Sequence, residues 1–218
     1  MIMRRITIIA GHYGSGKSEI SVNLALRYKI DTIVDLDIIN PYFRSRALHE
    51  LFEEHNIHLV ESTIKGMLNS DMPYVSGEAA VPFVQNHIRA IYDLGGTENG
   101  GRVLIQFVDR IKNLEDIDML YVVNIFRPET ANADLIVKAI HKLEGESQLK
   151  VTGLINNTNL MHLTTKEELL DGQKVLQEVS RRLQIPIRYT VIEETHTFEG
   201  DFEGGIIKLE RLVAKKWL

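Results

Sequence analysis

Gly11-His12-Tyr13-Gly14-Ser15-Gly16-Lys17-Ser18 is the stretch that decides the fold of this 218-residue chain. It matches the pattern G-x-x-x-x-G-K-[ST] at every fixed position. The apolar run Ile6–Ala10 precedes it, and a helix-compatible segment, Lys17–Tyr28, follows it. Strand, glycine loop and helix in this order are typical of a phosphate-binding loop. A dinucleotide-binding loop would instead need a third glycine, where this sequence has Glu19.

The residue types of the loop suit anionic oxygens. Glycines let backbone N–H groups approach a phosphate closely, and the helix that follows adds the positive end of its dipole. We expect Lys17 to reach the β- and γ-phosphates and the Ser18 hydroxyl to ligate Mg²⁺. The predicted nucleotide-binding residues of the loop are Gly11, His12, Tyr13, Gly14, Ser15, Gly16, Lys17, Ser18 and Glu19.

Short apolar runs alternate with longer helix-like stretches along the chain, which predicts crossover units and a mainly parallel sheet. We expect one α/β domain over residues 1–218, with a doubly wound, mainly parallel sheet of seven or eight strands and helices on both faces. The expected strands are Ile6–Ala10, Thr32–Leu36, Ile57–Val60, Ile88–Leu94, Met119–Ile125, Val151–Ile155 and Ile187–Ile192. The expected helices are Lys17–Tyr28, Arg44–His55, Arg102–Lys112, Ala131–Leu143, Lys166–Leu183 and Gly205–Lys216. Thr165 and Glu168 form a plausible capping box for the helix Lys166–Leu183.

Composition narrows the function. The net charge is −5 and no Lys/Arg block occurs, so there is no strong nucleic-acid signal. Cysteine is absent, which excludes disulfides, thiol catalysis and cysteine-ligated metals and fits a cytoplasmic location. We expect no signal peptide and no transmembrane segment. Residues 206–218 are expected to form an amphipathic helix on the sheet, with a membrane-surface helix as the alternative.

Acidic and amide side chains follow three of the expected strands, at the edge where a doubly wound sheet places functional residues. Asp93 ends an apolar strand just before Gly95 and Gly96, so we expect it to bind Mg²⁺ through water. Asp37 would lie beside it and orient or deprotonate an attacking water. Asp35 lies closer to the strand interior, where a structural role competes with a functional one. The predicted metal ligands are Ser18, Asp37 and Asp93, and the predicted catalytic residues are Lys17 and Asp37.

These segments together resemble the MinD/ParA/nitrogenase-iron-protein class of P-loop ATPases. The loop is similar to that class's deviant Walker A motif, the segment 34–37 to its first switch, and the segment 92–96 to its second switch. The segment Gly153–Thr158 resembles the strand whose terminal asparagine contacts adenine. The resemblance implies ATP and Mg²⁺ as ligands, Asn157 as the base-reading residue with Asn156 kept open, and slow turnover that depends on a protein partner.

The resemblance also implies a nucleotide-dependent homodimer, but one residue departs from the pattern. The class carries an extra lysine that contacts the nucleotide of the facing subunit, and this chain has His12 there. A neutral histidine does not replace a permanent cation. Dimer formation is therefore left open. The absence of an N-K-x-D guanine motif favours ATP over GTP, an inference that rests on the resemblance.

Several other features have a structural and a functional interpretation. His49, His55 and His58 could bind a metal, although a solvated helix face explains them better. Arg44 and Arg46 could supply charge to a γ-phosphate, although a surface role is simpler. Asn124 and the segment 127–130 are explained by helix capping. The glycine-rich segment 95–101 is expected to rearrange between nucleotide states. The base end of the pocket is expected to involve Glu193, Glu194, His196 and Phe198.

The leading hypothesis from the sequence is a Mg²⁺-dependent ATPase that works as a nucleotide switch on a partner protein. A small-molecule kinase or ATP-dependent ligase of the dethiobiotin-synthetase type is the alternative, with an acceptor pocket built from the segment Ile64–Val84. A nickel-type metal-insertion chaperone is disfavoured by the lack of cysteine. A non-catalytic nucleotide-binding regulator is the fourth possibility.

Overall fold

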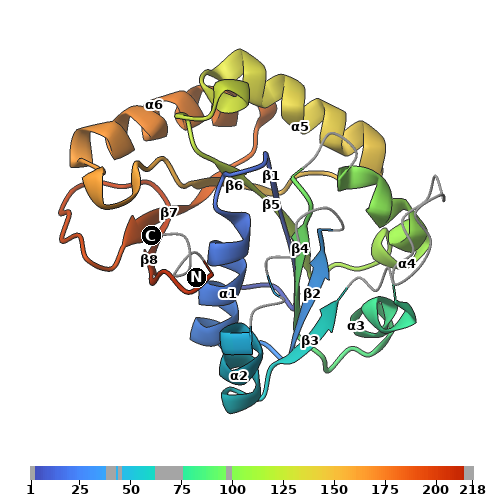
Figure 1. Ribbon diagram of the computed structural model, residues 1–218. Helices are drawn as coiled ribbons and strands as arrows, with labels where there is room; N and C mark the ends of the chain where they lie inside the picture. The colour runs from blue at the N-terminus through green and yellow to red at the C-terminus, as the bar shows by residue number, and fades with distance from the viewer. Residues whose placement is uncertain (1–2, 38–42, 44–45, 62–75, 97–99, 214–218) are drawn as a thin grey trace.

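The computed structural model describes residues 3–37, 43, 46–61, 76–96 and 100–213 (Figure 1). Strands and helices alternate along the chain, as the sequence predicts. The elements are β1 (Ile6–Gly11), α1 (Lys17–Tyr28), β2 (Thr32–Leu36), α2 (Arg46–Glu54), β3 (His58–Glu61), η2 (Gly77–Ala80), α3 (Val81–Val84), β4 (Ala90–Leu94), η3 (Gly100–Phe107), α4 (Val108–Ile111), β5 (Ile117–Val123), η4 (Pro128–Thr130), α5 (Ala133–Ser147), β6 (Gly153–Asn156), η5 (Met161–Leu163), α6 (Lys166–Leu183), β7 (Ile187–Glu193) and β8 (Gly205–Leu209).

The strands form one 8-stranded sheet in the order β3-β2-β4-β1-β5-β6-β7-β8, and every strand pair in it is parallel. The strand before the glycine loop, β1, pairs directly with β4, so that Ile9 is the register partner of Asp93. All carboxyl ends of a parallel sheet lie at one edge. This pairing therefore places the glycine loop next to Asp93.

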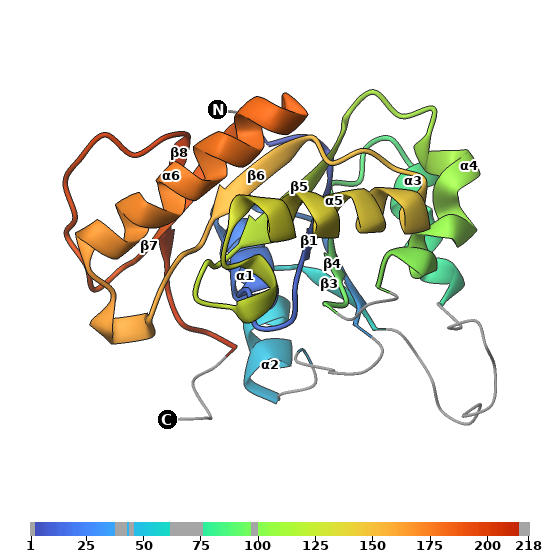
Figure 2. The same ribbon diagram turned by 90° about the horizontal axis from the view of Figure 1, so that it is seen from above.

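Helices cover both faces of the sheet, which confirms the predicted doubly wound fold class (Figures 1 and 2). Ile20 and Leu24 of α1 and Phe52 of α2 pack against the face that carries Ile9. The helices α5 and α6 cover the opposite face with η3, through the buried side chains Ile136, Ile140, Leu176, Val179 and Leu104. Near-continuous burial of the strands explains why they are apolar on both sides.

The helix α6 follows its sequence signals closely. The Thr165 hydroxyl accepts a hydrogen bond from the Glu168 N–H at 3.3 Å, and the Glu168 carboxylate accepts one from the Thr165 N–H at 2.8 Å. This reciprocal capping box satisfies two N–H groups that the first helical turn leaves without partners. The predicted helix bounds, Lys166–Leu183, are those observed.

The prediction of a C-terminal helix over Gly205–Lys216 is wrong. Residues Gly205–Leu209 form the edge strand β8, which pairs with β7 (Figure 2). Ile207 and Leu209 are buried while Lys208 between them is exposed, which is the two-residue period of a strand. The apolar residues of this segment fit a helical stripe as well, and pairing with the open edge of β7 decides between the two. The last residues of the expected helix, 214–218, lie outside the described residues.

The helix predicted over Arg102–Lys112 is also only partly present. A 3₁₀ helix, η3, occupies Gly100–Phe107, and a single turn of α-helix, α4, follows it. Residues 64–75 of the segment Ile64–Val84, which could build an acceptor pocket, lie outside the described residues, and the rest of the segment carries η2 and α3. No helix within the described ranges is long and apolar enough to cross a lipid bilayer.

Candidate nucleotide site

The glycine loop connects β1 to α1 as predicted, and three of its carbonyl groups accept hydrogen bonds from side chains. Lys17 Nζ donates to the His12 carbonyl at 3.1 Å, Arg127 Nε to the Gly14 carbonyl at 2.9 Å, and Asn157 Nδ2 to the Ser15 carbonyl at 2.6 Å. Gly16, at the N-cap of α1, has a φ of 90°, a conformation that favours glycine. A loop whose carbonyls are occupied in this way leaves N–H groups for an anion.

Two N–H groups of the loop are occupied: the Tyr13 N–H donates to the Gly96 carbonyl at 3.0 Å, and the Ser15 N–H donates to the His12 carbonyl at 3.1 Å. A Cβ atom added to Gly96 would lie 2.6 Å from both Lys17 Nζ and the Tyr13 nitrogen. The backbone after β4 therefore lies directly against the lysine and one amide of the loop. These are groups that a terminal phosphate would use.

Asp93 lies beneath the loop and joins it to the sheet. Its carboxylate accepts hydrogen bonds from Ser18 Oγ at 2.6 Å and from Ser21 Oγ at 2.9 Å. The side chain is 1% exposed, and burial raises the pKa of Asp93 to about 6 despite the opposing effects of Lys17 and of these two hydroxyls. The two residues predicted to hold Mg²⁺, Ser18 and Asp93, are therefore in direct contact, and their binding of the ion stays a prediction.

Three carboxyl groups share the region around Lys17. Asp37 is 5% exposed, and its backbone N–H donates to Asp35 Oδ1 at 2.9 Å. Burial, reinforced by the charges of Asp93 and Asp37, raises the pKa of Asp35 to about 8. Burial likewise lowers the pKa of Lys17, against the attraction of Asp93 and Asp37. A buried site with this many carboxyl groups has an excess of negative charge that a cation would relieve.

The residues present fit Mg²⁺. This ion prefers oxygen ligands and is typically held by one or two carboxylates, a hydroxyl and substrate phosphates. Ser18, Asp93 and Asp37 supply such oxygens within one buried region, and the charge of Asp37 raises the pKa of Asp93. These residues would hold the ion, whose role when bound is to neutralise charge on the phosphates.

A cavity of about 260 Å³ opens beside the loop. Of the predicted residues, Tyr13, Gly14, Gly16, Lys17, Ser18, Glu19, Asp37 and Asn157 line it. Gly11, His12, Ser15 and Asp93 do not belong to its lining, and Asp93 lies behind Ser18. Leu169, Val191, Leu209 and Val213 add apolar walls to the cavity. A phosphate-binding end joined to an apolar slot suits a nucleotide better than a free polyphosphate.

The structure separates the two candidate asparagines. Asn156 Nδ2 donates to the Leu169 carbonyl at 3.0 Å, and its Oδ1 accepts from the Thr158 N–H at 3.2 Å, so this fully buried side chain serves the fold. Asn157 lines the cavity and supports the loop through Ser15. Its reading of a base remains a proposal.

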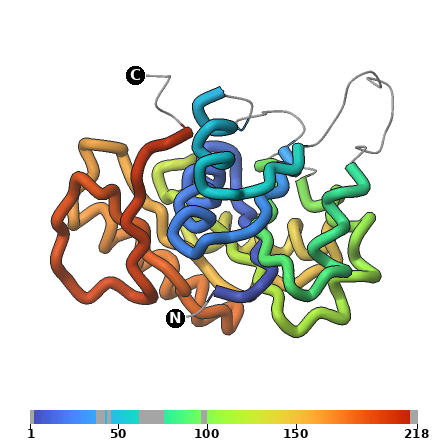
Figure 3. Tube along the Cα trace, turned by 90° about the horizontal axis from the view of Figure 1, so that it is seen from below, coloured from blue at the N-terminus to red at the C-terminus, as the bar shows by residue number. Residues whose placement is uncertain are grey.

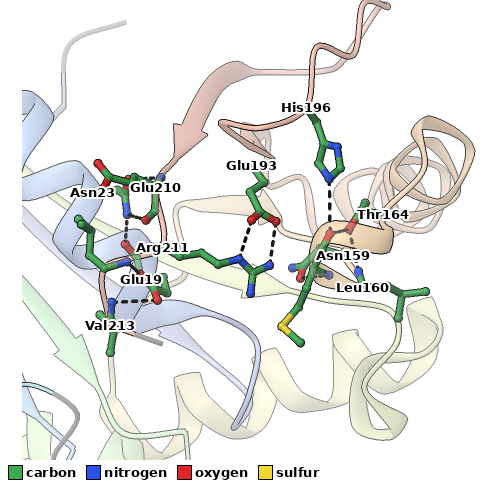
Figure 4. A network of polar contacts seen from close by, with 12 residues as sticks. Glu19, Asn23, Asn159, Leu160, Thr164, Glu193, His196, Glu210, Arg211 and Val213 are labelled. Carbon is green, nitrogen blue, oxygen red and sulfur yellow. Dashed lines mark hydrogen bonds and ion pairs between the residues drawn. The ribbon is translucent and has the colours of Figure 1, made fainter. Parts of the chain in front are cut away.

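Sequence reasoning placed Glu193, His196 and Phe198 at the base end, and all three line the cavity, whereas Glu194 is absent from the lining. It missed Arg211, which pairs with both carboxylate oxygens of Glu193 at 2.6 and 2.8 Å (Figure 4). This ion pair keeps the pKa of Glu193 below its ordinary value. Arg211 was missed because its segment was expected to be helical.

Residues 210–213, here called the C-terminal strap, continue from β8 alongside α1 (Figures 3 and 4). Asn23 exchanges hydrogen bonds of 2.8 Å with the backbone of Glu210 in both directions. The Glu19 carboxylate accepts the N–H groups of Leu212 and Val213 at 3.0 Å each. Glu19, the residue after Ser18, thus links the C-terminal strap to the start of α1. Its direct contact with nucleotide, which the sequence predicts, stays a prediction.

His49, His58 and Arg46, three of the remaining candidates, each face a carboxylate group. His49 lies 3.8 Å from Glu61 and His58 3.6 Å from Glu78, so the histidines face different carboxylates. No group of three or more His, Asp or Glu side chains that could hold a metal occurs among the described residues. Arg46 pairs with Glu50 on the exposed face of α2 at 2.8 Å, and Arg44 lies outside the described residues.

No protein-family model matches the sequence, and no curated protein matches it. Among solved structures, the chain is similar to the cell division protein FtsY of Thermotoga maritima, at 18% identity over 89% of this chain and 65% of that one, with a TM-score of 0.53. It is also similar to the chloroplast FtsY of Physcomitrella patens, at 16% identity over 87% of this chain and 59% of that one, with a TM-score of 0.53. A third similar structure is the signal recognition particle 54 kDa protein of Aeropyrum pernix in complex with GDP, at 14% identity over 97% of this chain and 44% of that one, with a TM-score of 0.52.

The chain therefore spans less than two thirds of the length of each of these proteins. At such low identity the likeness concerns the fold alone. The fold of this chain is that of P-loop nucleoside-triphosphatases, which agrees with the predicted class.

Proposed function

We propose that this protein is a Mg²⁺-dependent nucleotide-binding protein that hydrolyses ATP slowly and acts as a switch on a partner protein, in the manner of the MinD/ParA class. The observation that carries the proposal is the convergence of Lys17, Ser18 and Asp93. The loop's lysine, the hydroxyl of the next residue and a buried carboxylate on the neighbouring strand lie together. This combination binds a phosphate chain and its metal ion.

The proposed mechanism divides the work among these residues. Lys17 and the loop N–H groups bind the phosphate chain, while Ser18 and Asp93 hold the site for the ion. Asp37 lines the cavity and orients the attacking water or accepts its proton. Catalysis of this kind depends on positioned charge around the γ-phosphate, so turnover is slow until a partner completes the site.

The contact between Tyr13 and Gly96 supports the switch part of the proposal. The Gly96 carbonyl accepts a hydrogen bond from the Tyr13 N–H of the loop, and the backbone of Gly96 lies against Lys17. A γ-phosphate that binds both the Tyr13 N–H and Lys17 must displace residues 95–96. A nucleoside diphosphate lacks the γ-phosphate and does not displace these residues. The position of residues 95–96 would therefore differ between the triphosphate-bound and diphosphate-bound states.

The identity of the base and of the partner is part of the proposal. The sequence favours ATP, whereas the similar Aeropyrum pernix structure contains GDP, so guanine nucleotides are the direct competitor. A second copy of this chain, in a nucleotide-dependent homodimer, is one candidate partner. His12, which stands where the MinD/ParA class has a lysine that contacts the facing subunit, lies 3.5 Å from Glu129 of its own chain. We also propose a cytoplasmic location, in keeping with the absence of cysteine.

Titration calorimetry with Mg²⁺ and ATP, GTP and their diphosphates tests the proposal, with phosphate release followed in the same samples. We expect ATP to bind and to be hydrolysed slowly. Lys17→Ala should weaken binding by about 10- to 100-fold, because a charge-assisted contact contributes about 1.5–3 kcal/mol. Lys174→Ala, an exposed lysine paired with Asp171 on α6, is the matched control. Equal binding by Lys17→Ala and the unaltered protein would refute the site assignment.

A further inference from the structure

The phosphate loop has a second cation beside it, supplied by a segment to which the sequence assigned only helix capping. Arg127 follows β5 and lines the cavity together with Gly14, Lys17 and Asn157. Its Nε donates to the Gly14 carbonyl at 2.9 Å. A Cβ atom added to Gly14 would lie 3.1 Å from both Cζ and Nε of the guanidinium. The guanidinium therefore packs closely on the backbone in the middle of the loop.

The backbone that carries Arg127 is fixed by a compact set of hydrogen bonds around Asn124. The Asn124 carbonyl accepts from the Arg127 N–H at 3.1 Å and from Thr130 Oγ1 at 2.7 Å. The Asn124 side chain in turn donates to the Asn159 carbonyl at 3.1 Å. A long side chain on a fixed backbone loses less entropy when it binds a ligand, so Arg127 is partly organised in advance.

Charge sets Arg127 apart from the other cations of the cavity. Three Lys or Arg side chains line it. The charge of Lys17 is offset by Asp93 and Asp37, and that of Arg211 by its ion pair with Glu193. No acidic side chain among the described residues forms an ion pair with Arg127, and its two terminal nitrogens make no hydrogen bond to any of them. An exposed guanidinium with four N–H donors remaining beside a phosphate loop suits a phosphate oxygen.

We infer that Arg127 is a phosphate-binding residue of this site: through Nε it holds the Gly14 carbonyl, and through its terminal nitrogens it contacts the phosphate chain of the nucleotide. The inference rests on the proposed function and adds a residue to it. It also gives Asn124, which lines the cavity as well, a part in positioning Arg127.

Three substitutions separate the two contacts of Arg127. Arg127→Gln keeps an N–H donor for the Gly14 carbonyl and removes the charge. Arg127→Lys keeps the charge and loses the planar fork, and Arg127→Ala loses both. Arg110→Gln, on the exposed face of α4, removes one positive charge far from the loop and is the control. Affinity is measured by calorimetry at about 50 and 250 mM KCl with whichever of ATP and GTP the unaltered protein binds better, beside the melting temperature without nucleotide.

We expect Arg127→Gln to weaken binding by about 10-fold at low salt and to reduce the dependence of affinity on salt, as loss of one charge-assisted contact does. Arg127→Lys should retain most of the affinity, and Arg110→Gln should bind like the unaltered protein. The melting temperature of Arg127→Gln should stay within about 2 °C of the parent, since a surface substitution changes stability little.

Two results would overturn the inference alone. The first is that Arg127→Gln binds nucleotide as tightly as the unaltered protein does. Arg127 would then have only its contact with the Gly14 carbonyl and no contact with the phosphates. The other is an equal loss in Arg127→Gln and Arg127→Lys together with a lowered melting temperature, which would indicate a brace for the loop. If the unaltered protein binds neither ATP nor GTP, the proposed function fails and this inference fails with it.

Discussion

Asp35 on β2 and Asp93 on β4 are register partners, so their side chains lie on the same face of the sheet. Both are almost fully buried, and the pKa of each is raised, to about 8 for Asp35 and to about 6 for Asp93. Glu61 on β3 is the partner of Asp35 on its other side. Three neighbouring strands thus carry carboxyl groups at one level beneath the phosphate loop.

This arrangement predicts a pH dependence of stability in the nucleotide-free protein. The pKa of Asp35 rises from 3.8 to about 8 in the folded state, so the native protein binds the proton more tightly than the unfolded chain does. Its contribution to the free energy of unfolding is complete below pH 4 and is lost as the pH rises toward 8. Asp35→Asn keeps the oxygen that accepts the Asp37 N–H and should remove this slope, which is on the order of 1 kcal/mol per pH unit.

Urea denaturation at pH 5.5, 7 and 8.5 without Mg²⁺ measures the effect of Asp35→Asn. The variant should gain stability relative to the parent as the pH rises. Asp171→Asn, exposed on α6, should follow the parent at every pH. Parallel curves for Asp35→Asn and the parent would show that Asp35 titrates alike in the folded and unfolded states.

Asp37→Asn separates hydrolysis from binding. The side chain lines the cavity and its proposed work is on water, so its loss should slow phosphate release by about 10²- to 10⁴-fold. Nucleotide affinity should change by less than about threefold, because Ser18 and Asp93 still hold the ion and the loss of one oxygen ligand is offset by the removal of one negative charge near the phosphates. Single-turnover phosphate release and calorimetry on the same variant measure the two effects. Hydrolysis at the parent's rate would assign the water to another residue.

Gly96→Ala tests the contact between the segment after β4 and the loop. The added methyl group would lie 2.6 Å from the Tyr13 nitrogen, which is backbone and cannot give way as a side chain can. We expect residues 95–96 to be displaced and the nucleotide-free protein to lose about 1–3 kcal/mol of stability. Because this segment is proposed to respond to a γ-phosphate, the preference for triphosphate over diphosphate should shrink.

Gly145→Ala is the control for this substitution. It lies within α5, and a Cβ atom there would meet no heavy atom within 4 Å. Its helical setting predicts a gain of about 0.5–1 kcal/mol. Thermal melting and calorimetry with both nucleotides compare the two variants. An unchanged triphosphate preference in Gly96→Ala would argue against the γ-phosphate as the group that moves this segment.

The sequence predicted the parts of the site that short-range patterns determine. The loop, the strand before it and the capping box of α6 are each set by residues a few positions apart, and all three were confirmed. Asp93 could be paired with Ser18 because parallel strands bring their carboxyl ends to one edge.

The parts that were missed depend on contacts between distant segments. Ile206 and Leu209 fit a helical stripe, whereas Ile207 and Leu209 fit the alternation of a strand, and pairing with the open edge of β7 is what favours the strand. Arg127 lies more than a hundred residues from Gly14, and nothing in its immediate neighbourhood in the sequence indicates that contact. Arg211 was assigned to a helix face for the same reason, so its pairing with Glu193 could not be foreseen.

The C-terminal strap has a mechanical consequence. Its amides end on the Glu19 carboxylate in the first turn of α1, so a load applied beyond residue 213 is transmitted to the helix that begins at the phosphate loop. The chain enters β1 at Ile6, at the end of this strand opposite the phosphate loop. We therefore expect attachment to a sensor surface through the carboxyl terminus to alter measured nucleotide kinetics more than attachment through the amino terminus does.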